Sequence, residues 1–291
     1  MAGKTRIGAV SYLNTRPLVR GMEQGLGRER IELSYAVPSV LADRMTDGRL
    51  EIALLPIVEL ARIPDLELVP GLGIVTQGPS RSVLLVSRRP IDEIERVALD
   101  PESRTSNVLA RVLFAEVWRR SPDFEIGPAE LACALEDHDA AVRIGDKALF
   151  EPAPDGAFVY DLGGAWTEKT RLPFVFAAWA ARPGVVDREI YRILHDSRRQ
   201  GSKSIDAIVD GYDWKGIRNP EVAREYLTRH IRFRLGSPEL EAIELFLEAA
   251  RGLELIERVP KIKLALEKWT TCHEAAAARG MIDRPVGGDA A

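Results

Sequence analysis

The chain has 291 residues, a length typical of one large domain or of two domains of ordinary size. Apolar residues make up 46% and charged residues 29%, the composition of a globular protein with a sizeable core. The formal net charge of −4 argues against a nucleic-acid-binding protein, because such proteins usually carry a basic face. Cys133 and Cys272 lie far apart without a CxxC spacing, which excludes a disulfide framework and disfavours a cysteine zinc site.

The N-terminal segment MAGKTRIGAVSYLNTRPL has an apolar run that is interrupted after about seven residues, too short for the core of a secretory signal. No stretch of the sequence approaches the ~20 consecutive apolar residues that a membrane-spanning helix needs. We therefore expect a cytoplasmic protein whose partners include neither a membrane nor a nucleic acid.

The first ninety residues alternate between strand-like and helix-like patterns. Strands are expected at residues 6–10, 31–35 and 52–55, and helices at residues 15–24 and from Ser39, a predicted N-cap, to Gly48. Strands that alternate with helices at this spacing form a parallel sheet with helices on its faces. Because ligands bind at the carboxyl ends of such strands, the loops that follow them should share one functional edge.

The pattern restarts after a connector at residues 88–90. Further strands are expected at residues 83–87, 97–100, 140–144, 158–162 and 174–178, and helices at residues 105–118, 185–197, 205–211, 220–229 and 238–250. The sequence therefore predicts an α/β fold of two lobes, each a mostly parallel sheet flanked by helices, with a ligand cleft between the lobes. Lobe I is expected to comprise residues 1–87 and 178–291, and lobe II residues 88–177.

Common catalytic and cofactor motifs are missing from the sequence. The segment GLGIVT (71–76) lacks the third glycine of a dinucleotide fingerprint, and no GxxxxGK[ST], HExxH or GxSxG motif occurs. The histidines form no metal-ligand pattern apart from the adjacent Cys272 and His273, so we interpret them as solvated or structural. We therefore expect neither a metal nor a cofactor.

Four clusters of small polar residues lie at predicted strand ends and divide between the two lobes. They contain Ser11 and Asn14; Gly78, Ser80, Arg81 and Ser82; Ser103, Arg104, Thr105 and Ser106; and Gly145, Asp146 and Lys147. Each cluster also has a structural interpretation as a helix cap, a turn or a buried aspartate. The third opens a helix, where hydroxyls and free backbone N–H groups favour a carboxylate or phosphate. Together the clusters indicate a small carboxylate ligand held mainly by neutral donors.

Around these clusters the sequence resembles the chorismate dehydratase family of the futalosine route to menaquinone. The resemblance extends to about residue 275 and rests on six segments taken together: GAVSYLNTRPL (8–18), IALLPIVEL (52–60), GPSRSVLLVS (78–87), VALDPESRTS (97–106), RIGDKAL (143–149) and DLGGAWTEKTRLPFVFAAW (161–179). It implies a fold similar to type II periplasmic binding proteins, a cytoplasmic location, and dehydration of chorismate to 3-[(1-carboxyvinyl)oxy]benzoate.

Chorismate has an acidified ring hydrogen at C3 and a hydroxyl at C4, and losing both as water makes the ring aromatic. Two hypotheses remain open for the base. In one, the enolpyruvyl carboxylate of the substrate takes the proton and Asn14 orients the substrate, since well-placed internal groups have effective molarities on the order of 10⁵–10⁸ M. In the other, Asp146 is the general base. The predicted substrate-binding residues are Ser11, Ser39, Gly78, Ser80, Arg81, Ser82, Ser103, Arg104, Thr105, Ser106 and Gly145.

Two other functions stay open at this point. A cytoplasmic carboxylate-binding or sensor protein of the same fold would need no catalytic base. The sister enzyme 1,4-dihydroxy-6-naphthoate synthase carries a Pro-Asn-Asp-Thr type loop, whereas this chain has Tyr12-Leu13-Asn14-Thr15. The expected partner is a small dicarboxylate, chorismate, and the sequence leaves the oligomeric state open, with a homodimer as one option.

Overall fold

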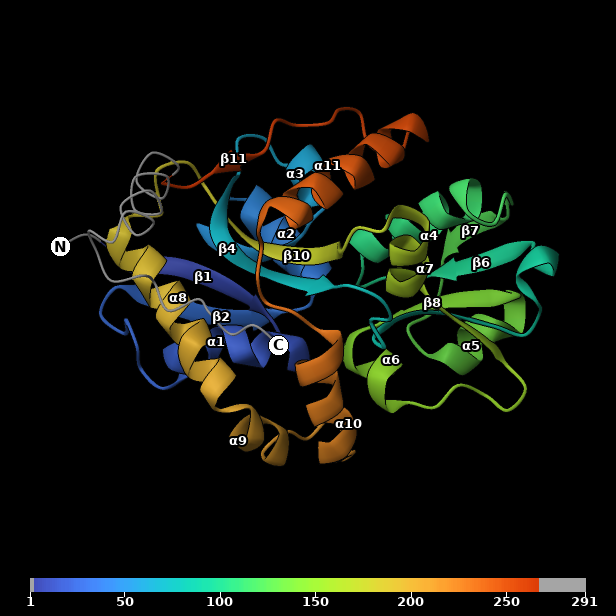
Figure 1. The fold of residues 1–291 in the computed structure, drawn as a ribbon, viewed down its shortest axis with the longest axis horizontal. Helices are drawn as coiled ribbons and strands as arrows, with labels where there is room; N and C mark the ends of the chain where they lie inside the picture. Colours follow the sequence, from blue (N-terminus) through green and yellow to red (C-terminus); the bar gives the residue numbers. More distant parts are fainter. Residues whose placement is uncertain (1–2, 267–291) are drawn as a thin grey trace.

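The computed structural model describes residues 3–266, and these form two lobes that lie side by side along the long axis of the molecule (Figure 1). Each lobe is built on one sheet. The first sheet has the strand order β11-β4-β10-β3-β1-β2, and the second has the order β7-β6-β8-β5-β9. The predicted two-lobed α/β fold is confirmed.

The first sheet is mixed. Its strands are β1 (Thr5–Val10), β2 (Ile31–Ala36), β3 (Ile52–Pro56), β4 (Glu67–Thr76), β10 (Phe174–Ala181) and β11 (Lys263–Leu264). β1 pairs in parallel with β2 and β3, while β10 runs antiparallel between β3 and β4. All five residues of β3 are buried, as a continuous apolar run covered by helices on both faces requires.

Helices from both ends of the chain cover this first sheet. They are α1 (Arg16–Glu23) after the 3₁₀ turn η1 (Leu13–Thr15), α2 (Pro38–Thr46), α3 (Glu59–Arg62), α8 (Arg188–Lys203), α9 (Ile205–Asp210), α10 (Pro220–Glu225), the π-helix η3 (Tyr226–His230) and α11 (Ser237–Gly252). α8 packs along α1 so closely that a Cβ on Gly201 would lie 1.9 Å from the Pro17 carbonyl oxygen. α11 contacts β10 and also reaches α4 of the other lobe.

The second lobe surrounds the five-stranded sheet. Its elements are β5 (Val83–Ser87), η2 (Ile91–Glu93), β6 (Arg96–Leu99), α4 (Thr105–Glu116), β7 (Asp123–Ile126), α5 (Leu131–Asp137), β8 (Ala140–Ile144), α6 (Gly145–Phe150), β9 (Phe158–Asp161) and α7 (Leu162–Thr170). β6 pairs in parallel with β7 and β8, whereas β5 runs antiparallel to β8 and β9.

The sheets divide the chain a few residues earlier than the sequence indicated. We expected residues 83–87 in lobe I and residues 174–177 in lobe II, but β5 lies in the second sheet and β10 lies wholly in the first. Both are short apolar runs, and hydrophobic pattern alone does not specify which sheet a buried strand joins. The chain therefore crosses between the sheets at residues 77–82 and again at residues 171–173.

The glycine-rich stretch that begins at residue 71 forms the second half of β4. Glycine weakens a strand unless another backbone approaches closely. Such an approach occurs here, because a Cβ on Gly73 would lie 3.1 Å from the carbonyl oxygen of Ala177 in the neighbouring β10.

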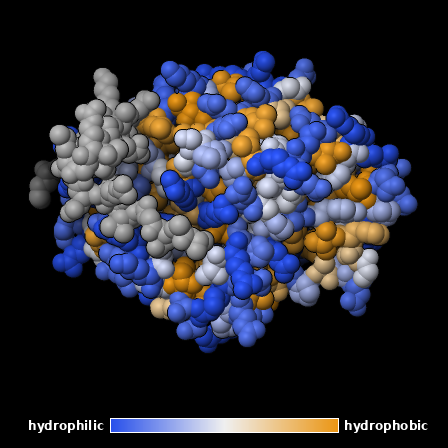
Figure 2. Space-filling model, in the orientation of Figure 1, coloured by the Kyte–Doolittle hydropathy of each residue, from blue (hydrophilic) through white to orange (hydrophobic). Residues whose placement is uncertain are grey.

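A continuous apolar core runs through both lobes and includes the fully buried Trp166 and Trp179. On the face shown in Figure 2, hydrophilic residues cover most of the described surface, and apolar residues lie between them in small groups. Within residues 3–266, none of the helices is both long and apolar enough to cross a membrane.

Candidate functional site

A cavity of about 60 Å³ lies where the two lobes meet. It is lined by Val10, Tyr12, Asn14, Pro38, Pro56, Ile74, Ser82, Val83, Ser103, Thr105, Ser106, Ile144, Gly145, Phe176 and Ala177. Val10, Pro56 and Ile144 are the last residues of β1, β3 and β8, so the cavity lies at the carboxyl ends of these strands. This is the edge at which open α/β sheets bind ligands.

The N-terminus of α4 supplies three of the cavity's hydroxyls, those of Ser103, Thr105 and Ser106. Thr105 Oγ1 accepts a hydrogen bond from the backbone N–H of Val58 at 3.2 Å, and Ser103 Oγ accepts one from Ser106 N–H at 3.2 Å. A hydroxyl has a single hydrogen, so both side chains keep theirs free to donate. Hydroxyl hydrogens beside a helix N-terminus suit a carboxylate.

Asn14, Tyr226 and Ser82 form a hydrogen-bonded chain along the cavity. Asn14 Nδ2 donates to Tyr226 Oη at 2.9 Å, and Tyr226 Oη lies 2.7 Å from Ser82 Oγ. Asn14 is 8% exposed, and its Oδ1 atom has no hydrogen-bond partner among the described residues. A buried acceptor without a partner costs free energy unless a ligand or water supplies the donor. Asn14, which lines the cavity, therefore has a buried acceptor that no described residue satisfies.

Gly145 follows β8 and forms part of the wall next to Tyr12. Its φ angle is +64°, and a Cβ at this position would lie 2.8–2.9 Å from the ring of Tyr12. Both observations require glycine, because a side chain would be strained at this φ and would displace the ring. The Tyr12 hydroxyl donates in turn to Glu102 Oε2 at 2.9 Å, which fixes the ring across the cleft.

We expect Gly145→Ala to lower the free energy of unfolding by about 1–3 kcal/mol and to weaken ligand binding, because the Tyr12 ring must move. Denaturant unfolding and ligand titration measure both effects. Gly156→Ala is a matched control, since Gly156 has a φ of +76° in the same lobe and open space around its Cβ position. Equal effects of the two substitutions would contradict a specific role for the Gly145–Tyr12 contact.

Asp146, the predicted alternative base, is 2% exposed but does not line the cavity. Its carboxylate accepts a hydrogen bond from Leu13 N–H at 3.0 Å and another from the Tyr212 hydroxyl. Burial raises the pKa of Asp146 to about 6, although both hydrogen bonds and the nearby Arg16 act in the opposite direction. The carboxylate thereby ties lobe II to the loop that carries Asn14.

The cations expected near the ligand are engaged elsewhere. Arg104 pairs with Asp43 and, at 3.4 Å, with the buried Glu59, both of which belong to lobe I. The Lys147 ammonium lies 2.9 Å from Asp100 Oδ2 and 3.1 Å from Glu102 Oε2. Arg81 is exposed. Among the described residues that line the cavity there is no lysine or arginine.

The remaining predicted residues lie outside the cavity lining. Ser80 is fully buried, and its hydroxyl donates to Asp161 Oδ2 at 3.3 Å and accepts from Val83 N–H at 3.1 Å. Asp161, which was not among the predicted site residues, also accepts from the backbone N–H groups of Ser80 and Arg81, so it shapes the turn. The backbone N–H of Gly78 donates to the Thr167 hydroxyl.

Two further predicted residues are chain neighbours of cavity-lining residues but do not line the cavity themselves. Ser11 is exposed, and its backbone N–H donates to Ala36 at the end of β2. Ser39 was expected to cap α2, but it lies inside the helix, and its backbone N–H donates to the Glu102 carbonyl of lobe II at 3.3 Å. Of the predicted site residues, those that line the cavity are Asn14, Ser82, Ser103, Thr105, Ser106 and Gly145.

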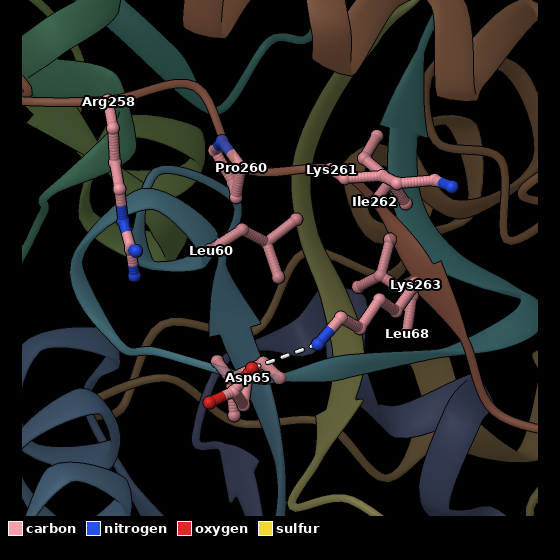
Figure 3. Close-up of a pocket in the computed structure, with 9 residues that line it drawn as sticks. Leu60, Asp65, Leu68, Arg258, Pro260, Lys261, Ile262 and Lys263 are labelled. Atoms are coloured by element: carbon pink, nitrogen blue, oxygen red, sulfur yellow. Dashed lines mark hydrogen bonds and ion pairs between the residues drawn. The ribbon is translucent and has the colours of Figure 1, made fainter.

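A second cavity, of about 170 Å³, lies between α3 and the C-terminal segment that leads into β11 (Figure 3). The ammonium of Lys263 points toward Asp65 at its rim, with a 2.9 Å ion pair. Both side chains are more than half exposed, and exposed ion pairs contribute little. The cavity lacks the converging buried polar groups of the interlobe site.

Comparison with known proteins decides the family. A family model described as menaquinone biosynthesis matches residues 5–252. The chain belongs to the menaquinone biosynthesis family. Two curated relatives are chorismate dehydratases, one from Thermus thermophilus and one from Campylobacter jejuni. The first is 27% identical over 261 residues, covering 84% of this chain and 94% of the relative. The second is 29% identical over 245 residues, covering 84% of this chain and 92% of the relative.

Solved structures place this member of the menaquinone biosynthesis family among the periplasmic-binding-protein folds. A protein from Archaeoglobus fulgidus aligns with a TM-score of 0.70 at 17% identity, covering 87% of this chain and 98% of that chain. A Candida albicans protein described as having the generic periplasmic binding protein fold aligns at 0.56 and 14% identity, covering 91% and 99%. The alkanesulfonate-binding protein of Xanthomonas axonopodis aligns at 0.59 and 17% identity, covering 89% and 96%.

Proposed function

We propose that this protein is a hydro-lyase that dehydrates chorismate to 3-[(1-carboxyvinyl)oxy]benzoate, the first step of futalosine-dependent menaquinone biosynthesis. The observation that carries the proposal is the unpartnered, buried Oδ1 of Asn14, a residue that lines the same cavity as the hydroxyl groups at the start of α4. Chorismate offers complementary groups, a hydroxyl and two carboxylates. The curated chorismate dehydratases, similar over 84% of the chain, support the same activity.

Neutral donors are available in the cavity to stabilise the charge that develops in this reaction. Removing the C3 hydrogen spreads negative charge through the ring diene onto the ring carboxylate. Preorganised donors aimed at that carboxylate stabilise the charge as it develops. We assign this task to Ser103, Thr105 and Ser106, whose hydroxyls lie at the start of α4. Apolar wall residues such as Ile74 and Phe176 exclude water around the ring.

The enolpyruvyl carboxylate of the bound substrate is the base that we favour. It takes the C3 proton, the ring electrons expel the C4 oxygen, and the carboxylic acid returns the proton to that oxygen, so water leaves. The proton passes from C3 to the carboxylate and then to the departing oxygen, so the reaction needs no protein base. A group held in reach of C3 supplies a large effective concentration, on the order of 10⁵–10⁸ M. Asp146 supports this choice, because its carboxylate is already engaged by Leu13 and Tyr212.

Two other functions make different predictions. A carboxylate-binding or sensor protein would bind chorismate and release it unchanged. The sister 1,4-dihydroxy-6-naphthoate synthase would act on a larger cyclic substrate. The dehydratase form of the loop at Asn14 favours chorismate dehydration. The cytoplasmic location, the absence of a cofactor and the oligomeric state remain predictions.

Incubation of purified, EDTA-treated protein with chorismate tests the proposal. We expect a product lighter than chorismate by one water, with the ultraviolet spectrum of an aromatic ring. Unchanged chorismate with saturable binding would identify a binding protein, and naphthoate formation from the larger cyclic substrate would identify the sister enzyme. Turnover that disappears with EDTA and returns with a metal would contradict the metal-free mechanism.

A further inference from the structure

Tyr226 forms hydrogen bonds with two residues that line the cavity, but it does not line the cavity itself. It is the first residue of the π-helix η3 (Tyr226–His230) and is 1% exposed. Its hydroxyl lies 2.9 Å from Asn14 Nδ2 and 2.7 Å from Ser82 Oγ, so it links the turn after β1 to the connector that leads into β5. π-helical turns are rare and occur frequently at functional sites.

The single hydrogen of the Tyr226 hydroxyl links the orientations of its two neighbours. Asn14 Nδ2 only donates, so Tyr226 Oη accepts from Asn14, whereas in the 2.7 Å contact with Ser82 Oγ either hydroxyl can donate. We take Tyr226 as the donor, because Ser82 Oγ is the acceptor that its hydrogen reaches among the described residues. Ser82 Oγ then keeps its hydrogen for the cavity, and Asn14 turns its oxygen away from Tyr226. In the opposite arrangement, Asn14 would accept from Tyr226, and the Ser82 hydrogen would be used up on Tyr226. The two cavity groups therefore change roles together.

We propose that Tyr226 is a positioning residue that fixes Asn14 as an acceptor and Ser82 as a donor toward the substrate. This inference rests on the proposed dehydration of chorismate. In that reaction, Asn14 Oδ1 accepts a hydrogen bond from the C4 hydroxyl. This contact holds the C4–O bond close to perpendicular to the ring plane, so that the ring π electrons can break it. Ser82 donates to a substrate carboxylate. Without Tyr226, the Asn14 amide and the Ser82 hydroxyl would rotate independently.

Tyr226→Phe tests the inference, because the substitution removes the hydroxyl and keeps the buried ring. We expect kcat for chorismate to fall about 10- to 100-fold, with a smaller change in KM. Tyr160→Phe is the matched control. The Tyr160 hydroxyl accepts a hydrogen bond from Ile91 N–H at 2.9 Å within lobe II and does not contact the cavity residues. The control variant should keep the wild-type kcat, and melting temperatures of both variants show whether folding is affected.

A double substitution separates positioning from general structural support. If Tyr226 acts through Ser82, the combined Tyr226→Phe and Ser82→Ala enzyme should lose little more kcat than the more severe single variant. If the losses of kcat in the two single variants multiplied in the double variant, or if Tyr226→Phe kept the wild-type kcat, the inference would be overturned. The proposed function would stand in either case, provided that the wild-type protein dehydrates chorismate. A wild-type protein that leaves chorismate unchanged would instead refute the proposed function, and the role of Tyr226 with it.

Discussion

Asn14→Ala is expected to reduce kcat for chorismate by about 100-fold, while the protein stays folded. The substitution removes the unpartnered Oδ1 atom that we assign to the substrate hydroxyl, and a misplaced reacting bond costs about this factor. Steady-state kinetics with chorismate measures the loss. Asn219→Ala is the control, since Asn219 is an exposed asparagine that caps α10 by accepting from Val222 N–H.

Asn14→Asp tests the hydrogen-bond roles of Asn14 and Ser82 separately from the shape of the site. An ionised aspartate only accepts hydrogen bonds, so Tyr226 would donate to it and Ser82 would donate to Tyr226. The shape of the site would be kept, but the Ser82 hydrogen would be withdrawn from the cavity and a negative charge would face the substrate carboxylates. We expect this enzyme to bind chorismate more weakly than the alanine variant. An unchanged kcat in Asn14→Ala would remove Asn14 from the mechanism.

Asp146→Asn should keep most of the turnover and should change how stability depends on pH. Burial raises the pKa of Asp146 from 3.8 to about 6, so the folded protein binds this proton more tightly than the unfolded chain does. Stability from this group is therefore highest below pH 4, falls as the pH rises from 4 to 6, and is constant above that range. The difference amounts to about 3 kcal/mol. Asparagine does not titrate, so the variant should lose this part of the pH dependence.

Denaturant unfolding between pH 3.5 and pH 8 measures the effect, with the exposed Asp155→Asn as a control. At pH 8 we expect Asp146→Asn to be at least as stable as the wild type, because the amide oxygen still accepts from Leu13 N–H. Asp146→Ala leaves that buried N–H unpaired and should be less stable than Asp146→Asn. If turnover by Asp146→Asn instead fell by about three orders of magnitude or more, with binding intact, Asp146 would be identified as the general base.

The part of the site that could be predicted from the sequence is the part set by local structure. Asn14, Ser103 and Gly145 each follow a strand, and the carboxyl ends of neighbouring strands share one edge whatever the details of the sheet. The same reasoning predicted the alternation of strands and helices in the first ninety residues. It did not specify the sheet of β5 or β10, because partners of a buried strand are chosen by tertiary packing.

Side-chain partners distant in the sequence account for the rest. Arg104 was expected near the ligand, but its carboxylate partners Asp43 and Glu59 belong to the other lobe and hold it there. Asp146 follows Gly145, which lines the cavity, but its carboxylate accepts hydrogen bonds from Leu13 N–H and the Tyr212 hydroxyl instead. Tyr226 lies 212 positions from Asn14 and carries no motif, so no pattern in the sequence indicated their contact.

The most direct test of the account uses chorismate deuterated at C3. We expect the protein to release a dehydrated aromatic product that has lost the deuterium, and we expect turnover to be slower than with unlabelled chorismate when C–H cleavage limits the rate. Because the deuterium leaves with the water, the product should be identical in mass to that from unlabelled substrate. A product that keeps the deuterium, or chorismate recovered unchanged, would contradict dehydration by removal of the C3 hydrogen in this cleft.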